Sequence, residues 1–186
     1  ARKEEFVMQK KVLILSSSPR VKGNTDLLCD MFAKGAADAG HEVEKISLNQ
    51  KKIGYCQACA ACRKNGGTCI LGDDGQEIVE KLVASDVFVL ASPVYYSSIS
   101  GQLKTLIDRT YSHTSDIHDK TAYFILASGA KTKEGVAGAV SDFRGFLENL
   151  KNVREGGVIY GTGAYYLGDI QNHPALKEAY EMGKSI

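Results

Sequence analysis

The sequence predicts an α/β fold, a doubly wound, five-stranded parallel sheet with helices on both faces. Short apolar runs alternate along the chain with stretches in which apolar residues recur at helical spacing. The runs at residues 12–15 and 87–91 are continuously apolar, as expected for central strands that are covered on both sides. With 186 residues, 44% of them hydrophobic and 24% charged, we expect residues 1–186 to form a single domain with a substantial core.

Each expected element has its own pattern. Apolar runs predict strands at residues 12–15, 87–91, 122–127 and 158–160, and a less apolar stretch at 43–48 predicts a further strand nearer an edge of the sheet. Helical spacing predicts helices that start near residue 26, at Asp74, and near residues 103, 136 and 174. Gly40 ends the first helix, and Asp74 with Glu77 forms a variant of the capping box at the start of the second. Within residues 1–186, residues 1–9 are expected to be a flexible extension.

Charge and hydropathy argue against nucleic-acid binding and against insertion into a membrane. The formal net charge is +1, which creates no strong field for nucleic acid or for an acidic partner. No apolar run approaches the ~18 residues of a membrane-spanning helix. Residues 1–5 lack the pattern of a signal peptide. We therefore expect a cytoplasmic protein that binds neither nucleic acid nor a membrane.

The stretch from Ser16 to Thr25 joins the first expected strand to the first helix. It lacks the Gly-Lys-Ser/Thr ending of nucleoside triphosphate loops and the G-x-G-x-x-G dinucleotide fingerprint. Amides at a helix N-terminus favour an anion, and hydroxyl, amide and guanidinium side chains suit a phosphate monoester. The candidate ligands are Ser16, Ser18, Arg20, Asn24 and Thr25. The alternative is an ordinary connection in which Asn24 or Thr25 caps the helix.

Two further loops leave the carboxyl ends of strands, where ligands bind in doubly wound sheets. One carries Tyr95 and Tyr96, which suit a flat ring unless they pack in the core. The other is a turn of small residues that lets backbone approach the same ring. The candidate residues are Pro93, Val94, Tyr95, Tyr96, Ser97, Ser98, Ser128, Gly129 and Ala130. A phosphate site beside a planar aromatic site predicts flavin mononucleotide (FMN) better than a sugar phosphate.

Several short motifs occur together in order over the first two-thirds of the chain. They are Ser18-Pro19-Arg20 with Gly23-Asn24-Thr25, Ser92-Pro93-Val94-Tyr95, Gln102-Leu103-Lys104 and Ile107-Asp108-Arg109. In these motifs the sequence resembles the flavodoxin-like NADPH-dependent FMN reductase family. The resemblance implies that the first loop binds the FMN phosphate and that the other two border the isoalloxazine ring.

Two positions depart from this family pattern. Ser17 stands where glycine is usual, and Ser100-Gly101 replaces a common Pro-Ala pair. These departures change local backbone freedom but remove no candidate ligand. On the resemblance we also expect a homodimer or homotetramer.

Four cysteines crowd into one loop after the second expected strand: Cys56, Cys59, Cys62 and Cys69. The spacing C-x2-C-x2-C-x6-C permits a [4Fe–4S] cluster, a zinc ion, or plain thiols and disulfides. The loop resembles the cysteine motif of iron–sulfur flavoproteins, a branch of the same family, which implies electron transfer between cluster and FMN. Because the loop follows a strand, we expect it near the flavin of its own or a neighbouring subunit.

The resulting prediction is an FMN-dependent oxidoreductase that takes electrons from NAD(P)H or ferredoxin. The acceptor would be a small molecule: a quinone, free flavin, a nitro or azo compound, or O2. The alternatives are a flavodoxin-type electron carrier and a non-enzymatic metal-binding module. No general acid or base is assigned, and Asp108 and Arg109 are interpreted as structural.

Overall fold

The computed structural model describes residues 8–186 and contains a parallel sheet with strand order β2-β1-β3-β5-β6. The parallel strands are β1 (Lys11–Ser16), β2 (Glu42–Ser47), β3 (Val87–Tyr95), β5 (Thr121–Ser128) and β6 (Arg154–Thr162). This is the order of the flavodoxin-like fold, so the predicted fold class is confirmed. Most of the expected extension, residues 1–7, lies outside the described residues.

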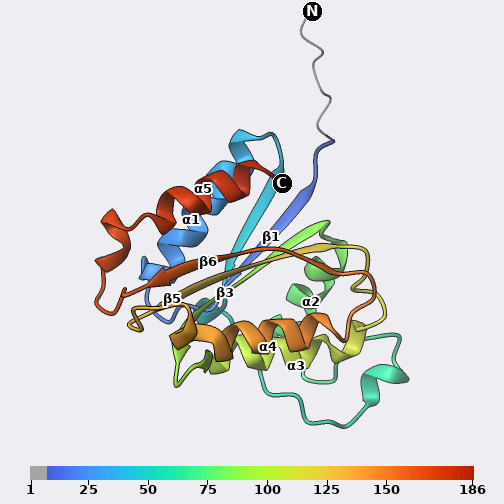
Figure 1. Ribbon diagram of the computed structural model, residues 1–186. Coiled ribbons are helices and arrows are strands. Elements are labelled where there is room, and N and C mark those ends of the chain that lie inside the picture. Colours follow the sequence, from blue (N-terminus) through green and yellow to red (C-terminus); the bar gives the residue numbers. More distant parts are fainter. Residues whose placement is uncertain (1–7) are drawn as a thin grey trace, which may run out of the picture.

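Helices cover both faces of the sheet (Figure 1). They are α1 (Asn24–Asp38), α2 (Asp74–Ala84), α3 (Gly101–Arg109), α4 (Ala137–Leu147) and α5 (Ala175–Lys184). Helices α1 and α5 pack on one face, and α2, α3 and α4 lie on the other. No helix in residues 8–186 combines the length and apolar character that crossing a membrane requires.

Strand β1 shows how the apolar runs build two cores. Successive side chains of a strand point to opposite faces. Leu13 and Leu15 join the core under α2, α3 and α4, whereas Val12 and Ile14 join the core under α1 and α5. Because both faces are covered, the strand is continuously apolar from Val12 to Leu15 rather than alternating.

Two details differ from the sequence-based expectation. Helix α2 is capped by Asp73, whose side chain accepts a hydrogen bond from the Gly75 amide, so Asp74 is the first helical residue rather than the cap. A short strand, β4 (Ser98–Ile99), pairs antiparallel with the end of β3. No local sequence pattern indicates this hairpin, because its turn residues are Tyr96 and Ser97 rather than the usual Asn-Gly.

Candidate functional site

A cavity of about 580 Å³ opens at the carboxyl ends of β1, β3, β5 and β6. The switch point, at which the order of strands along the sheet reverses, lies between the parallel strands β1 and β3 at this edge. Three loops that are far apart in sequence meet here. They contribute the predicted residues Ser18, Arg20, Asn24, Thr25, Pro93, Val94, Tyr95, Tyr96, Ser97, Ser128, Gly129 and Ala130.

Two predicted ligands, Ser16 and Ser98, do not line this cavity. Ser16 ends β1 with its side chain buried, and its Oγ donates a hydrogen bond to Asp26 Oδ1 at 3.2 Å. Ser98 Oγ donates to Asp142 Oδ2 at 2.6 Å, on the far side of the β3–β4 hairpin. Both hydroxyls serve the framework of their loops rather than the cavity wall.

The first loop folds into a compact turn ahead of α1. Ser18 Oγ donates to the Arg20 carbonyl at 2.9 Å, and the Gly23 amide donates to the same carbonyl at 3.1 Å. A Cβ at Gly23 would lie 2.7 Å from Ser18 Oγ, so this turn needs glycine at that position. Gly23 occupies the N-cap position without a side-chain cap, so neither Asn24 nor Thr25 caps the helix.

Beside the loop that precedes α1, the negative charge of Asp26 is paired with the positive charge of Lys45. Asp26 lies in the first turn of α1, where the helix dipole favours a carboxylate. Its Oδ2 accepts a hydrogen bond from the Lys22 amide at 3.2 Å, and its Oδ1 pairs with Lys45 Nζ at 3.0 Å. Lys45 thereby offsets the carboxylate, and Arg20 remains the cation that lines the cavity.

The β3–β4 hairpin forms a second wall and holds its aromatic residues out of the core. Tyr96 and Ser97 both have positive φ, 49° and 63°, which is costly for residues other than glycine and marks a constrained turn. Tyr96 is fully exposed and Tyr95 is 46% exposed. The alternative in which these tyrosines pack in the core is therefore wrong.

Helix α4 fixes the position of this hairpin. Asp142 Oδ2 accepts hydrogen bonds from Ser98 Oγ and from the Ile99 amide, the latter at 3.1 Å. Gly138 lies directly under the turn, and a Cβ there would overlap the Ser97 carbonyl oxygen. The hairpin thus rests on a glycine and a carboxylate of the same helix.

The loop after β6 forms a wall that sequence reasoning missed. Tyr165 and Ala164 line the cavity, and Tyr165 packs against Gly129 so closely that a Cβ at Gly129 would lie 2.7 Å from Tyr165 Cδ2. The signal was present, because Tyr165-Tyr166 directly follow a strand just as Tyr95-Tyr96 do. The other lining residues not predicted are Pro19, Gly23, Ala127 and Gly135.

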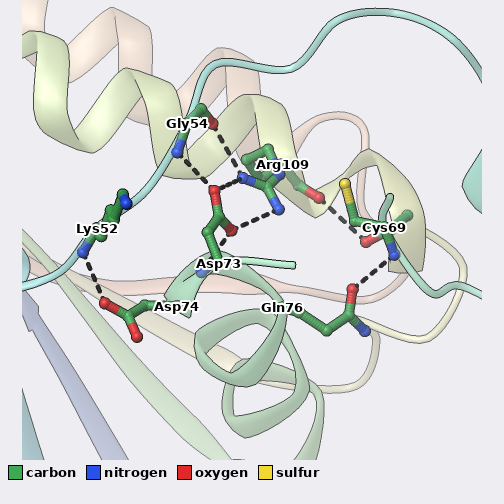
Figure 2. Close-up of polar contacts among 9 residues, drawn as sticks. Lys52, Gly54, Cys69, Asp73, Asp74, Gln76 and Arg109 are labelled. Carbon is green, nitrogen blue, oxygen red and sulfur yellow. Dashed lines mark hydrogen bonds and ion pairs between the residues drawn. The ribbon is translucent and has the colours of Figure 1, made fainter. Parts of the chain in front are cut away.

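The cysteine loop is closed at its neck by a buried ion pair (Figure 2). Arg109, at the end of α3, donates from Nη1 to Asp73 Oδ2 at 2.8 Å and from Nη2 to Asp73 Oδ1 at 2.9 Å. Asp73 Oδ2 also accepts the Gly54 amide at 2.7 Å, and Arg109 Nη1 donates to the Gly54 carbonyl at 2.9 Å. The guanidinium beside Asp73 lowers the pKa of that carboxyl to about 2. Arg109 thus joins the two ends of the loop, which agrees with the structural interpretation.

The four thiols are not gathered for metal binding. Cys56 and Cys59 are exposed, Cys62 and Cys69 are partly buried, and in residues 8–186 no three His, Cys, Asp or Glu side chains come close enough to hold a metal. None of the four lines the 580 Å³ cavity. A larger cavity of about 920 Å³ lies between this loop and helices α3 and α4, but no residue of the stretch from Ser16 to Thr25 lines it. We therefore place the ligand site in the smaller cavity.

Comparison with known proteins agrees with this geometry. A family profile described as NADPH-dependent FMN reductase matches residues 10–161, well over half of the chain. The chain belongs to this family. The resemblance predicted from the motifs is thereby confirmed.

Individual relatives of this FMN reductase family member add detail. An iron–sulfur flavoprotein of Archaeoglobus fulgidus is 37% identical over 131 residues, which span 69% of this chain and 59% of that protein. An iron–sulfur flavoprotein of Methanocaldococcus jannaschii is 42% identical over 100 residues, or 54% of this chain and 51% of that protein. The chain thus spans little more than half the length of these relatives.

Among solved structures, an NAD(P)H:quinone oxidoreductase from Methanothermobacter marburgensis matches with a TM-score of 0.71 at 22% sequence identity. The match covers 95% of this chain and 96% of that one. At this level of identity the likeness shows the shared fold.

Proposed function

We propose that this protein is an FMN-dependent oxidoreductase that takes electrons from NAD(P)H and delivers them to a small acceptor. The main support for this proposal is the lining of one cavity. At one end lie the N-terminus of α1, Arg20 and Thr25, and at the other lie tyrosines and a turn of small residues. This donor set fits a terminal phosphate, and the exposed rings with the Gly129 turn fit a flat heterocycle. When bound, FMN would supply the hydride and electron transfer chemistry.

The chain's own residues have placing roles in this proposal. Arg20, Thr25 and the amides of the first turn of α1 would bind the phosphate. Pro93–Ser97 and Ser128–Ala130 would flank the ring and exclude water from it. No side chain in the cavity is assigned to move a proton.

The acceptor class is open to a direct assay. We propose a quinone, free flavin, a nitro or azo compound, or O2, because exposed tyrosines line the cavity and such rings suit planar molecules. NADPH or NADH oxidation by FMN-loaded protein should require one of these acceptors and should stop when FMN is removed. A flavodoxin-type carrier, the alternative, would hold FMN but oxidise neither nicotinamide.

An iron–sulfur cluster in the cysteine loop is a separate prediction. It is supported by the C-x2-C-x2-C-x6-C spacing and by the names of the two archaeal relatives. The thiols as placed do not fit a cluster, so we assign no step to it. Iron and sulfide analysis of anaerobically prepared protein tests it, and zinc analysis tests the other metal.

The remaining expectations are also proposals. Ferredoxin as an electron donor depends on that cluster, and the homodimer or homotetramer rests on family resemblance. Five free cysteines suit the reducing cytoplasm. Sedimentation analysis would give the oligomer size.

A further inference from the structure

The loop after β6, residues 163–169, is held over the cavity by a side chain that we had predicted to bind phosphate. We call these residues the flap. Asn24 Nδ2 donates to the Tyr166 carbonyl at 2.8 Å, and Asn24 Oδ1 accepts the Ile170 amide at 3.4 Å. Both ends of the Asn24 amide are thus engaged with the flap or the residue that follows it.

The flap has the features of a distinct segment. Near its two ends lie Gly163 and Gly168, which have positive φ of 78° and 91°. Asp169, the last residue of the flap, accepts hydrogen bonds at Oδ2 from the amides of Tyr165 and Tyr166 at 2.9 and 2.7 Å, which closes the turn from within. The rings of Tyr165 and Tyr166 pack edge to face, with centroids 4.9 Å apart.

The flap also reaches the opposite end of the cavity. The Gly163 amide donates to the Ala130 carbonyl at 2.7 Å, and the Ala164 amide donates to the Ser128 carbonyl at 2.8 Å. Tyr165 then covers Gly129 in that same turn. A continuous set of contacts therefore runs from Asn24, at the phosphate end, through the flap to the turn at the ring end.

We propose that Asn24 is a positioning residue that latches the flap, and thereby sets Tyr165 as a wall of the ring end, rather than a ligand of the phosphate. The ring-end consequence depends on the proposed FMN site, whereas the latch itself does not. Asn24 is the first residue of α1, so its short side chain is held by a rigid helix, and its amide supplies the donor and the acceptor that the flap requires. Arg20 also contacts the flap, because its Nη1 donates to the Tyr165 carbonyl at 3.4 Å, longer than the Asn24–Tyr166 bond. Thr25 and the other guanidinium donors of Arg20 remain for the phosphate.

Two measurements on the full chain separate a latch from a phosphate ligand. The first is hydrogen exchange without added flavin: Asn24→Ala should speed exchange of the Ile170 amide and of the flap amides at least about fivefold, from loss of roughly one hydrogen bond's free energy. Asn24→Asp keeps the acceptor for Ile170 but loses the donor to Tyr166. In this variant the Ile170 amide should keep its slow exchange, whereas the Tyr165 and Tyr166 amides should exchange faster. Asn49→Ala, which removes an amide contact to the Pro19 carbonyl, is the matched control and should leave the flap unchanged.

The second measurement compares affinity for FMN with affinity for riboflavin, which lacks the phosphate. The quantity compared is the affinity for FMN divided by the affinity for riboflavin. Asn24→Ala should change both affinities alike and keep this ratio within about twofold of the wild-type value. Thr25→Ala should lower the ratio about tenfold, because a charge-assisted hydrogen bond to the phosphate is lost. Unchanged flap exchange in Asn24→Ala, or a fall in its ratio like that of Thr25→Ala, would each overturn the latch. If wild-type protein bound neither flavin, the proposed function would fail, and hydrogen exchange alone would decide on the latch.

Discussion

Ser100 Oγ donates a hydrogen bond to Ser17 Oγ at 2.8 Å, and both side chains are fully buried. These are two positions at which the chain departs from the usual residues of its family. Ser17 Oγ in turn donates to the Ala91 carbonyl at 2.8 Å, and the Ser100 amide donates to Ser92 Oγ at 2.8 Å. The two departures are therefore one structural feature, which ties the first loop to β3 and to the start of α3.

We expect the two serines to be energetically coupled. Ser17→Ala and Ser100→Ala should each lower the free energy of unfolding by about 1 kcal/mol, and Ser100→Ala slightly more because Ser100 also caps α3. The double variant should cost less than the sum, since the shared bond is lost only once. Urea denaturation of the four proteins measures this, and strictly additive losses would show that the contact contributes nothing.

Removing Arg109 should destabilise the protein without touching the ligand cavity. Its side chain is 2% exposed and bound to Asp73, so Arg109→Ala leaves a buried carboxylate without its cation and should cost about 3 kcal/mol. Arg144→Ala is the matched control, because its bidentate pair with Glu155 is largely exposed and should be worth under about 1 kcal/mol. Loss of turnover in Arg109→Ala with unchanged Tm and oligomer size would contradict the structural role.

The same ion pair predicts a dependence of stability on pH. The folded-state pKa of Asp73 is lowered to about 2, mainly by its hydrogen bonds from Arg109, below its ordinary value of 3.8. Its stabilising contribution, about 2 kcal/mol, is therefore complete above roughly pH 5 and is lost as pH falls toward 2. Wild type should exceed Asp73→Asn in unfolding free energy at neutral pH, and this gap should narrow by that amount on acidification. A gap independent of pH would show that the carboxylate charge does not matter.

Gly138 and Gly145 offer a paired test of the hairpin wall, because both belong to α4. A Cβ at Gly138 would overlap the Ser97 carbonyl oxygen, whereas a Cβ at Gly145 would meet no atom within 4 Å. Gly145→Ala should raise stability by up to about 1 kcal/mol through helix propensity. Gly138→Ala should displace the Tyr95–Ser98 turn and weaken flavin binding measurably. Equal flavin affinity in the two variants would separate the hairpin from the site.

The central strands β1, β3 and β5 could be predicted because each contains an apolar run that is covered on both faces, such as residues 12–15. The edge strands β2 and β6 carry weaker patterns, and a less apolar stretch and a short apolar run indicated them. The sequence also predicted which loops meet at the cavity, since the strand order of a doubly wound sheet brings carboxyl ends together. The Asn24–Tyr166 contact joins residues 142 positions apart and leaves no local pattern. The arrangement of the cysteines was not predictable either, because spacing gives the reach of a loop but not the conformation that the Arg109–Asp73 pair and its neighbours impose.

The proposed function depends on FMN binding in the cavity, with its phosphate at the loop before α1. Titration of the flavin-free 186-residue chain with FMN tests this most directly. We predict one FMN per chain, and an affinity at least about tenfold weaker in the Arg20→Ala, Thr25→Ala double variant, because contacts to a dianion are lost. An FMN affinity unchanged in that variant, or no binding by the wild-type chain, would contradict the account.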